Sequence, residues 1–309
     1  MFGPVTKIFS GAALIALAMV AMASSAFAQA LVDYQMWHQP AASPGQEWIE
    51  WFDVLTFKII TPITLFVTVL LGYAMIRFRA SANPVPSKTT HNTLIEVIWT
   101  VVPILILIGL SVPSLKLLSS QFHPPKEPTV TIKATGYQWY WGYEYQGENE
   151  VSFESRLIGR DLASQDPAKR EEAKKELASY GKSDIKTYPR LLVVDNEVVV
   201  PVNEVVRVLV TAGDVIHNWA MPAFGMKMDG IPGRLNETFF MPTKEGLYYG
   251  QCSELCGRDH SYMPIAVRVV SAEQYAAWLK GAADDLDKAN RDLIASVETA
   301  KKNVQVAGN

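Results

Sequence analysis

The longest apolar stretches of the chain lie in its first 120 residues and indicate membrane-spanning helices. Ile59–Ile76 runs for 18 residues without a charge, and Val97–Leu115 runs for 19. About 20 helical residues, rising ~1.5 Å each, cross the ~30 Å hydrocarbon layer of a bilayer. Because a short polar loop joins the two runs, they predict a transmembrane helical hairpin over residues 53–118. A pair of buried core helices is the alternative.

A shorter apolar run at the N-terminus predicts a secretory signal peptide. Lys7 supplies one positive charge, Ile8–Ala23 is apolar and rich in alanine, and Ala26–Ala28 has the small-x-small pattern of a cleavage site. We therefore expect residues 1–28 to be removed before Gln29, which leaves residues 29–52 as an exported N-terminal segment. An uncleaved anchor is the alternative.

The charges around the two long runs predict their orientation. The loop between the runs carries no acid before Glu96, and its basic residues are Arg77, Arg79 and Lys88. The acids ahead of the first run are Asp33, Glu47, Glu50 and Asp53. Since basic loops stay in the cytoplasm, both ends of the hairpin should emerge on the exported side of the membrane.

From Pro128 onward the apolar pattern changes to a period of two, which is typical of strands. TVTIKATG, RLLVVDNEVVVPVNEVVRVLVTAG and MPIAVRVV alternate β-branched and polar residues between turn residues. They predict an all-β sandwich over residues 119–270. Two segments of mixed charge differ from this pattern. We expect residues 160–186 to form a solvent-facing helical insertion and residues 271–309 to form a C-terminal helix and tail.

Composition limits the classes of partner. The chain is 49% hydrophobic and 19% charged, and its net charge is −3. A nucleic-acid-binding protein would need a basic face. The composition therefore favours a lipid bilayer as a partner and argues against nucleic acid.

Residues 250–263, GQCSELCGRDHSYM, contain both cysteines of the chain, Cys252 and Cys256, followed by His260 and Met263. A disulfide across three residues closes too small a loop to stabilise much, and it leaves the histidine and methionine unexplained. Structural zinc suits thiolates and imidazoles but has no use for a thioether. Copper accepts all three donor types. With His217 upstream in GDVIHNW, the residues favour a copper electron-transfer site over the other two.

Four segments together resemble subunit 2 of the cytochrome c oxidases. They are CSELCGRDHSYMP, GDVIHNW, GYQWYWGYEY (136–145) and KMDGIPGRLN (227–236). The resemblance covers residues 40–280. It implies a Greek-key, cupredoxin-like fold for the exported domain and a place in a bacterial inner (plasma) membrane, with the C-terminal domain on the periplasmic side. The insertion at 160–186 is similar to those of bacterial members.

The resemblance also implies a binuclear copper A centre. Its ligands would be His217, Cys252, Cys256, His260, Met263 and the backbone carbonyl of Glu254, with both thiolates shared between two copper ions. The side chain of Glu254, a hard oxygen donor, would reach a magnesium or manganese ion shared with subunit 1. A solvated acid is the alternative for this side chain. No Cys-x-x-Cys-His is present, so no haem is expected in this chain.

Further residues gain roles only through the resemblance. Trp139 would receive electrons from cytochrome c, although aromatic residues alternating on a strand ordinarily fill a core. Glu144, Asp195 and Asp214 match acids around the docking face, although each alone reads as a solvated surface charge. Glu96 matches a glutamate at the mouth of a proton path into subunit 1, although charges at helix ends often only reach toward the interface.

The predicted function is that of subunit 2 of a proton-pumping cytochrome c oxidase. The resemblance implies that electrons from cytochrome c pass through the copper pair to the haem of subunit 1, where oxygen is reduced to water. The expected partners are subunit 1, other oxidase subunits and cytochrome c. A membrane-tethered copper carrier, which would hold a single labile Cu(I), is the alternative.

Overall fold

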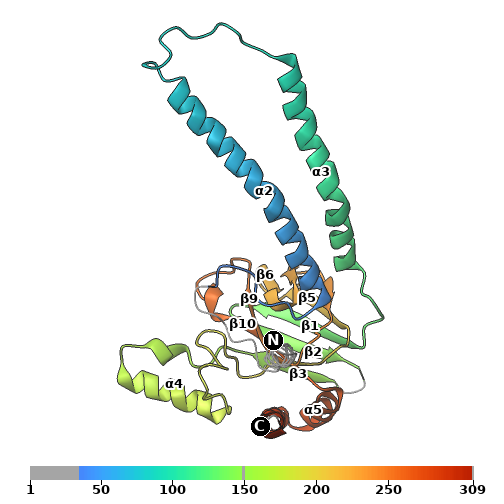
Figure 1. Ribbon diagram of the computed structural model, residues 1–309. Coiled ribbons are helices and arrows are strands. Elements are labelled where there is room, and N and C mark those ends of the chain that lie inside the picture. The colour runs from blue at the N-terminus through green and yellow to red at the C-terminus, as the bar shows by residue number, and fades with distance from the viewer. Residues whose placement is uncertain (1–34, 148–149, 308–309) are drawn as a thin grey trace, which may run out of the picture. The chain divides into compact units, whose positions relative to one another are not determined.

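The computed structural model describes residues 35–147 and 150–307, with side chains up to residue 300, and divides into two units (Figure 1). One unit is Glu47–His123, and the other joins the residues up to Gln46 to those from Pro124 onward. The expected signal peptide, residues 1–28, lies outside the described residues.

The unit Glu47–His123 contains two long helices, α3 (Thr93–Phe122) and all but the first three residues of α2 (Pro44–Arg77). Their most apolar windows have mean hydropathies of 2.2 and 2.4, and none of either window is buried within the structure. The helices are long and apolar enough to cross a membrane, which agrees with the predicted hairpin. Both extend beyond the apolar runs, because the flanking polar turns continue the helices without needing to lie in hydrocarbon.

Polar side chains within this unit satisfy local backbone groups. Thr64 and Thr68 in α2 donate their hydroxyls to the carbonyls four residues earlier, at 2.9 and 2.7 Å. At the start of α3, the side chain of Asn92 accepts from Ile95 N at 3.3 Å, and Asn92 N donates to Glu96 Oε1 at 3.1 Å. This reciprocal cap fixes where α3 begins.

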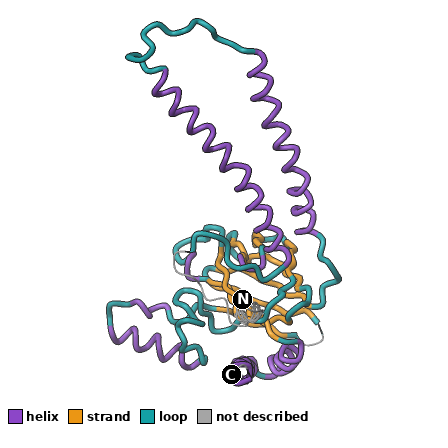
Figure 2. The backbone as a smooth tube through the Cα atoms, viewed as in Figure 1, coloured by secondary structure: helices purple, strands orange, loops and turns teal. Residues whose placement is uncertain are grey.

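The second unit is a β-sandwich of two five-stranded sheets, whose strands are orange in Figure 2. The first sheet has the order β3-β2-β1-β5-β8, with β1 (Val130–Tyr137), β2 (Tyr140–Gln146), β3 (Val151–Ser155), β5 (Val206–Ala212) and β8 (Asn236–Phe240). The second has the order β4-β10-β9-β6-β7, with β4 (Val198–Pro201), β6 (His217–Met221), β7 (Met226–Gly230), β9 (Gly246–Cys252) and β10 (Pro264–Val270). The predicted hairpin and sandwich are confirmed.

The period-two alternation of the strands builds the core between the sheets. In β5, Val206, Val208 and Val210 are buried, while the residues between them are half-exposed. Trp141 and Trp219 are the largest fully buried side chains of the described residues. Each large apolar side chain buried in this way stabilises the fold by roughly 1.5–3 kcal/mol relative to exposure.

A second apolar cluster covers the outer face of β9 and β10. All seven residues of β10 are buried, so both faces of this strand are covered. The cluster is formed by Ile158, Leu177, Tyr188, Val193, Val194, Leu247, Tyr249 and Ala266. Residues 160–186 contain a short 3-10 helix, η1 (Arg160–Ala163), and α4 (Pro167–Ser179). Most of α4 faces solvent as expected, but Ala173 and Leu177 are buried, so the insertion also adds a third layer.

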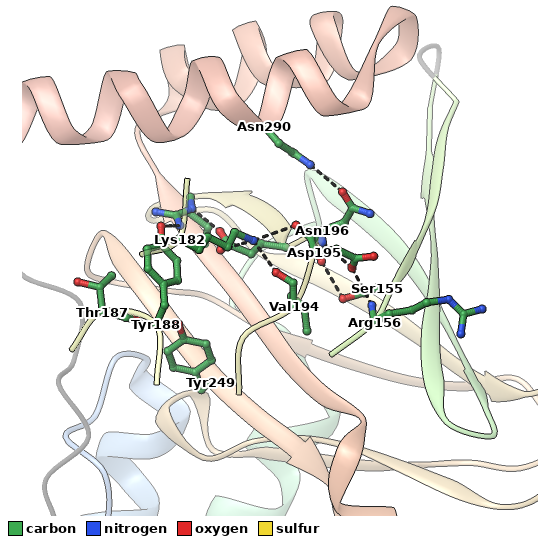
Figure 3. Close-up of polar contacts among 12 residues, drawn as sticks. Ser155, Arg156, Lys182, Thr187, Tyr188, Val194, Asp195, Asn196, Tyr249 and Asn290 are labelled. Carbon is green, nitrogen blue, oxygen red and sulfur yellow. Dashed lines mark hydrogen bonds and ion pairs between the residues drawn. The ribbon is translucent and has the colours of Figure 1, made fainter. Parts of the chain in front are cut away.

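A buried ionic network anchors this layer (Figure 3). Lys182, only 2% exposed, donates to the carbonyl of Val194 at 2.6 Å and pairs with Glu197 at 3.0 Å. Glu197 also pairs with Arg268, which donates to the hydroxyl of Tyr188 at 3.0 Å. Burial alone would raise the pKa of Glu197, but Arg268 and Lys182 outweigh it and lower the pKa to about 2.

Replacing Glu197 with glutamine should destabilise the sandwich by about 3–5 kcal/mol at neutral pH, because it removes the carboxylate that pairs with two buried cations. The folded-state pKa lies below the ordinary value of 4.5. The native carboxylate therefore stabilises the fold fully above that value, and this contribution is lost as the pH falls toward 2. Amide hydrogen exchange of β10 in the purified protein at several pH values measures both effects.

The matched control is Glu154→Gln, because Glu154 forms an exposed ion pair with Arg156. Exposed pairs contribute about 0–1 kcal/mol, so this variant should differ little from the native protein. Equal loss of stability in the two variants, or an unchanged pH profile in Glu197→Gln, would contradict the prediction.

The C-terminal region forms two helices where one helix and a tail were expected. They are α5 (Ala272–Asp284) and α6 (Leu286–Ala307), with Asp285 between them. A capping box of Ser271 and Gln274 starts α5. Trp278 is buried and donates to Asn290 Oδ1 at 2.8 Å, and Asn290 donates to Asn196 Oδ1 at 2.9 Å. Figure 3 shows Asn290 reaching from its helix toward Asn196.

Candidate metal centre

The thiols and one imidazole converge where β6 begins and β9 ends. His217 is the first residue of β6, and Cys252 is the last residue of the neighbouring antiparallel strand β9. The Sγ of Cys252 lies 3.9 Å from His217 Nδ1 and 3.9 Å from the Sγ of Cys256. Metal-binding atoms of these three residues all lie within 4.8 Å of one another.

Two further donors approach from the loop between β9 and β10. His260 Nδ1 lies 3.3 Å from Cys256 Sγ, and Met263 Sδ lies 3.5 Å from the same sulfur. His217, both cysteines and Met263 are each no more than 6% exposed, whereas His260 is half-buried. The structure therefore brings all five predicted side-chain ligands into one cluster, in which four are buried and His260 is half-buried.

Local contacts hold the loop in place. Ser253 N donates to the carbonyl of Asn218 in β6 at 3.2 Å, and the thiol of Cys252 contacts the carbonyl of Glu254 at 3.4 Å. The indole of Trp141 donates to the carbonyl of Met263 at 3.3 Å. Gly257 has φ of +120°, which a residue with a side chain rarely adopts. Strand neighbours thus fix both ends of the ligand loop.

A close approach also explains a glycine in β1. A Cβ at Gly136 would lie 2.7 Å from the ring of His217, which is shorter than real Cβ contacts. Glycine at this position therefore lets the imidazole pack against the strand. On another side, the ring of Trp141 lies 6.0 Å from that of His217, in an edge-on arrangement.

The structure distinguishes between the three interpretations of the cysteine loop, which are a disulfide, a zinc site and a copper site. The sulfurs of Cys252 and Cys256 are 3.9 Å apart, well beyond the ~2.05 Å of a disulfide bond, and both cysteines are free. The donor set also includes the thioether of Met263, which zinc does not use. Two thiols, two imidazoles and a thioether fit copper.

The two thiols differ in acidity. Burial raises the pKa of Cys252, but the hydrogen bond that its thiol shares with His217 and its backbone hydrogen bonds outweigh burial, so the pKa of Cys252 falls below its ordinary value. Burial and the neighbouring charge of Cys252 raise the pKa of Cys256 to about 12. A second thiolate in this cluster therefore needs a nearby positive charge.

Trp139 lies in a turn, which corrects its assignment to a strand. Tyr137 pairs with Tyr140, so Gln138 and Trp139 form the two-residue connection of the β1–β2 hairpin. The half-buried indole of Trp139 donates to the carbonyl of Cys256 at 3.2 Å, and Gln138 Nε2 donates to the same carbonyl at 2.9 Å. The turn is thus hydrogen-bonded to a ligand residue.

The three acids expected at a docking face have different surroundings. Glu144 is exposed on β2 and pairs with Lys133 at 2.9 Å. Asp195 is half-buried, accepts from the backbone of Arg156 at 2.7 Å, and has a raised pKa because of burial. Asp214 accepts from His217 Nε2 at 2.9 Å. Sequence reasoning missed that contact, although the spacing of the two residues in GDVIH could have suggested it.

The two predicted glutamates, Glu254 and Glu96, belong to different units of the structure. The side chain of Glu254 is exposed, while its carbonyl faces Cys252. Glu96 is in the first turn of α3, in the other unit, where it caps the helix through Asn92. Gln138 was not singled out by sequence because a lone glutamine in an aromatic run carries no signal for a site.

Comparison with known proteins gives consistent matches. The family profile described as "Cytochrome C oxidase subunit II, periplasmic domain" matches residues 130–270, and "Cytochrome C oxidase subunit II, transmembrane domain" matches residues 31–117. "Cytochrome c oxidase subunit 2" of Cereibacter sphaeroides is 49% identical over 246 residues, 79% of each chain. "Probable cytochrome c oxidase subunit 2" of Rickettsia felis is 45% identical over 258 residues, 84% of this chain and 75% of the relative.

Solved structures also include a similar protein. The crystal structure of the periplasmic domain of subunit II of cytochrome oxidase from Bradyrhizobium japonicum is 47% identical in sequence. The match covers 52% of this chain and 98% of that domain, with a TM-score of 0.42.

Proposed function

The chain belongs to the cytochrome c oxidase subunit 2 family, and from this premise we propose that its sandwich binds a pair of copper ions through the loop after β9. The chain is thus part of an oxidoreductase complex of the membrane. The proposed ligands are His217, Cys252, Cys256, His260, Met263 and the carbonyl of Glu254. One observation carries the proposal: each of two neighbouring thiols has its own imidazole, at 3.9 Å for Cys252 and 3.3 Å for Cys256.

When bound, the copper pair supplies a one-electron carrier. The chain's own residues supply a fixed and dry surrounding for it. Trp141 and Gly136 confine the ring of His217, and the buried thioether of Met263 covers the sulfur of Cys256. Ligands held by packing and hydrogen bonds move little between oxidation states, which favours rapid electron transfer.

Trp139 is the residue at which we propose that electrons from cytochrome c arrive. Its indole is one hydrogen bond from the carbonyl of Cys256, which supports a short connection from the surface to a ligand residue. The guanidinium of Arg258 lies 5.5 Å from the centre of the indole ring. In the complex, the haem and the reduction of oxygen to water belong to partner subunit 1, where protons are also pumped.

Of the three acids proposed to dock cytochrome c electrostatically, Glu144 is the one to test. Asp195 and Asp214 instead accept backbone hydrogen bonds within the fold. Glu144→Gln should raise the KM for cytochrome c a few-fold at low ionic strength and have little effect at high salt, because salt screens exposed charges. Steady-state turnover at several salt concentrations measures this. Glu237→Gln on β8, three strands away in the same sheet, is the matched control. Identical salt profiles would remove Glu144 from the docking face.

Glu254 and Glu96 have proposed roles at the border with subunit 1. The exposed carboxylate of Glu254 is a hard donor that suits a shared magnesium or manganese ion. Glu96, at the start of α3, is proposed to stand at the cytoplasmic mouth of a proton path. Its position beside the basic loop agrees with the orientation expected in a bacterial inner membrane, with the sandwich on the periplasmic side.

Metal analysis of the purified complex tests the proposed centre. We expect two copper ions for each copy of this chain beyond the copper of other subunits, with an unpaired electron shared by two copper nuclei in the magnetic resonance spectrum. A chain that purifies alone with one exchangeable Cu(I) would instead support the copper carrier.

A further inference from the structure

Asp214 occupies an unusual position for a surface acid. Its carboxylate accepts three hydrogen bonds, from His217 Nε2 at 2.9 Å, Val215 N at 2.6 Å and Gln138 N at 2.7 Å. These donors lie on β6, on the loop before it and in the β1–β2 turn.

The contact determines which nitrogen of His217 faces the sulfurs. Because Nε2 lies against a carboxylate, it carries the proton and donates to Asp214, which leaves the Nδ1 lone pair directed toward Cys252. His217 is fully buried, and Gly136 and Trp141 limit rotation of its ring. A carboxylate in this position also increases the basicity of the imidazole as a metal ligand.

The same carboxylate connects the two sides of the site. Gln138 donates its backbone N–H to Asp214 and its side-chain amide to the carbonyl of Cys256. The β1–β2 turn therefore joins the strand that carries His217 to the loop that carries the second thiol. A side chain that served only to attract a partner would need none of these bonds.

We propose that Asp214 is a positioning residue of the metal centre, which orients His217 and ties the Gln138–Trp139 turn to it, and that it is not primarily a docking charge. The inference rests on the proposed copper site. It assigns Asp214 an effect on the metal that is independent of cytochrome c.

Two substitutions in the purified oxidase complex separate these roles. Asp214→Glu keeps the charge but displaces the carboxylate by one methylene, which docking should tolerate and positioning should not. Asp214→Asn keeps the shape but removes the charge. We expect both variants to lose copper to a Cu(I) chelator about 10–100-fold faster than the native complex, as for other residues that orient metal ligands. We also expect the reduction potential of the copper site to rise in Asp214→Asn, and the KM for cytochrome c to stay near the native value in Asp214→Glu.

Glu144→Gln is the matched control, since Glu144 contacts no predicted ligand among the described residues, and its copper release should equal that of the native complex. If Asp214→Glu and Asp214→Asn release copper at the native rate and keep the native absorption spectrum, the inference is wrong. If the Asp214 variants purify with normal haem content but without copper in this centre, the inference is supported. If the native complex itself contains no such copper, the proposed function fails, which is a separate result.

Discussion

Replacement of either Cys252 or Cys256 with serine is expected to abolish the two-copper magnetic resonance signal of the complex. Serine keeps the size of the side chain but offers a hard hydroxyl, which copper binds poorly compared with a thiolate. Since the two sulfurs lie 3.9 Å apart and each contacts a different imidazole, removal of one leaves ligands for at most one copper ion. Turnover with cytochrome c should fall to background, and copper analysis should show at least one ion lost per chain.

Ser253→Ala is a suitable control for these variants, because Ser253 is an exposed neighbour in the same loop. Its hydroxyl contacts only the carbonyl of Gln251, at 3.2 Å, among the hydrogen bonds described for it. It should keep both copper ions and the native spectrum. Retention of two copper ions with an unchanged spectrum in both serine variants would show that the sulfurs do not hold the pair.

The sequence predicted those parts of the molecule that depend on local patterns. The membrane helices follow from two long apolar runs, and the sandwich follows from period-two segments bounded by turn residues. The ligand loop was predictable because four donors lie within 12 residues, and a hydrophobic strand followed directly by GDVIH places the fifth. Each of these signals lies within one short stretch of chain.

Features that depend on contacts between distant segments were not predictable in this way. The turn at Gln138 and Trp139 lacks the glycine or asparagine that usually marks a two-residue hairpin, so the aromatic run read as one continuous strand. Lys182 lies in a segment rich in charge, and only its pairing with Glu197 of the sandwich explains its burial. In the sequence, Asp214 could not be distinguished from other surface acids, because its three hydrogen-bond donors are seen only in the folded structure.

Contacts with the strands keep the metal site ordered although it lies close to solvent. His260 is half-buried and Leu255 is 77% exposed, so the loop itself is not deeply enclosed. Its ends are nevertheless fixed by β6 through Asn218 and by β2 through Trp141. A site that is rigid but near the surface suits exchange of electrons with a separate protein, because the donor can come close without disturbing the ligands.

Trp139→Phe is expected to slow the transfer of electrons from cytochrome c by at least about tenfold, which corresponds to ~1.4 kcal/mol in the barrier, while copper content stays at the native level. Phenylalanine is smaller and lacks the indole N–H, so it cannot donate to the carbonyl of Cys256. Gln138 still donates to that carbonyl at 2.9 Å, which should keep the ligand loop in place. Rapid mixing of reduced cytochrome c with the oxidised complex measures the rate, and metal analysis measures the copper.

Tyr140→Phe in the same hairpin is the control for this variant, because it removes only a hydroxyl from a ring that stacks on Tyr137 at 5.0 Å. Its transfer rate should match that of the native complex. Loss of copper in Trp139→Phe would mean that the indole is a support of the ligand loop, and a native transfer rate would mean that electrons arrive elsewhere. If transfer is slow in Trp139→Phe with full copper content, and is not slow in Tyr140→Phe, then the indole of Trp139 acts in electron transfer and is not needed to hold the ligand loop in place.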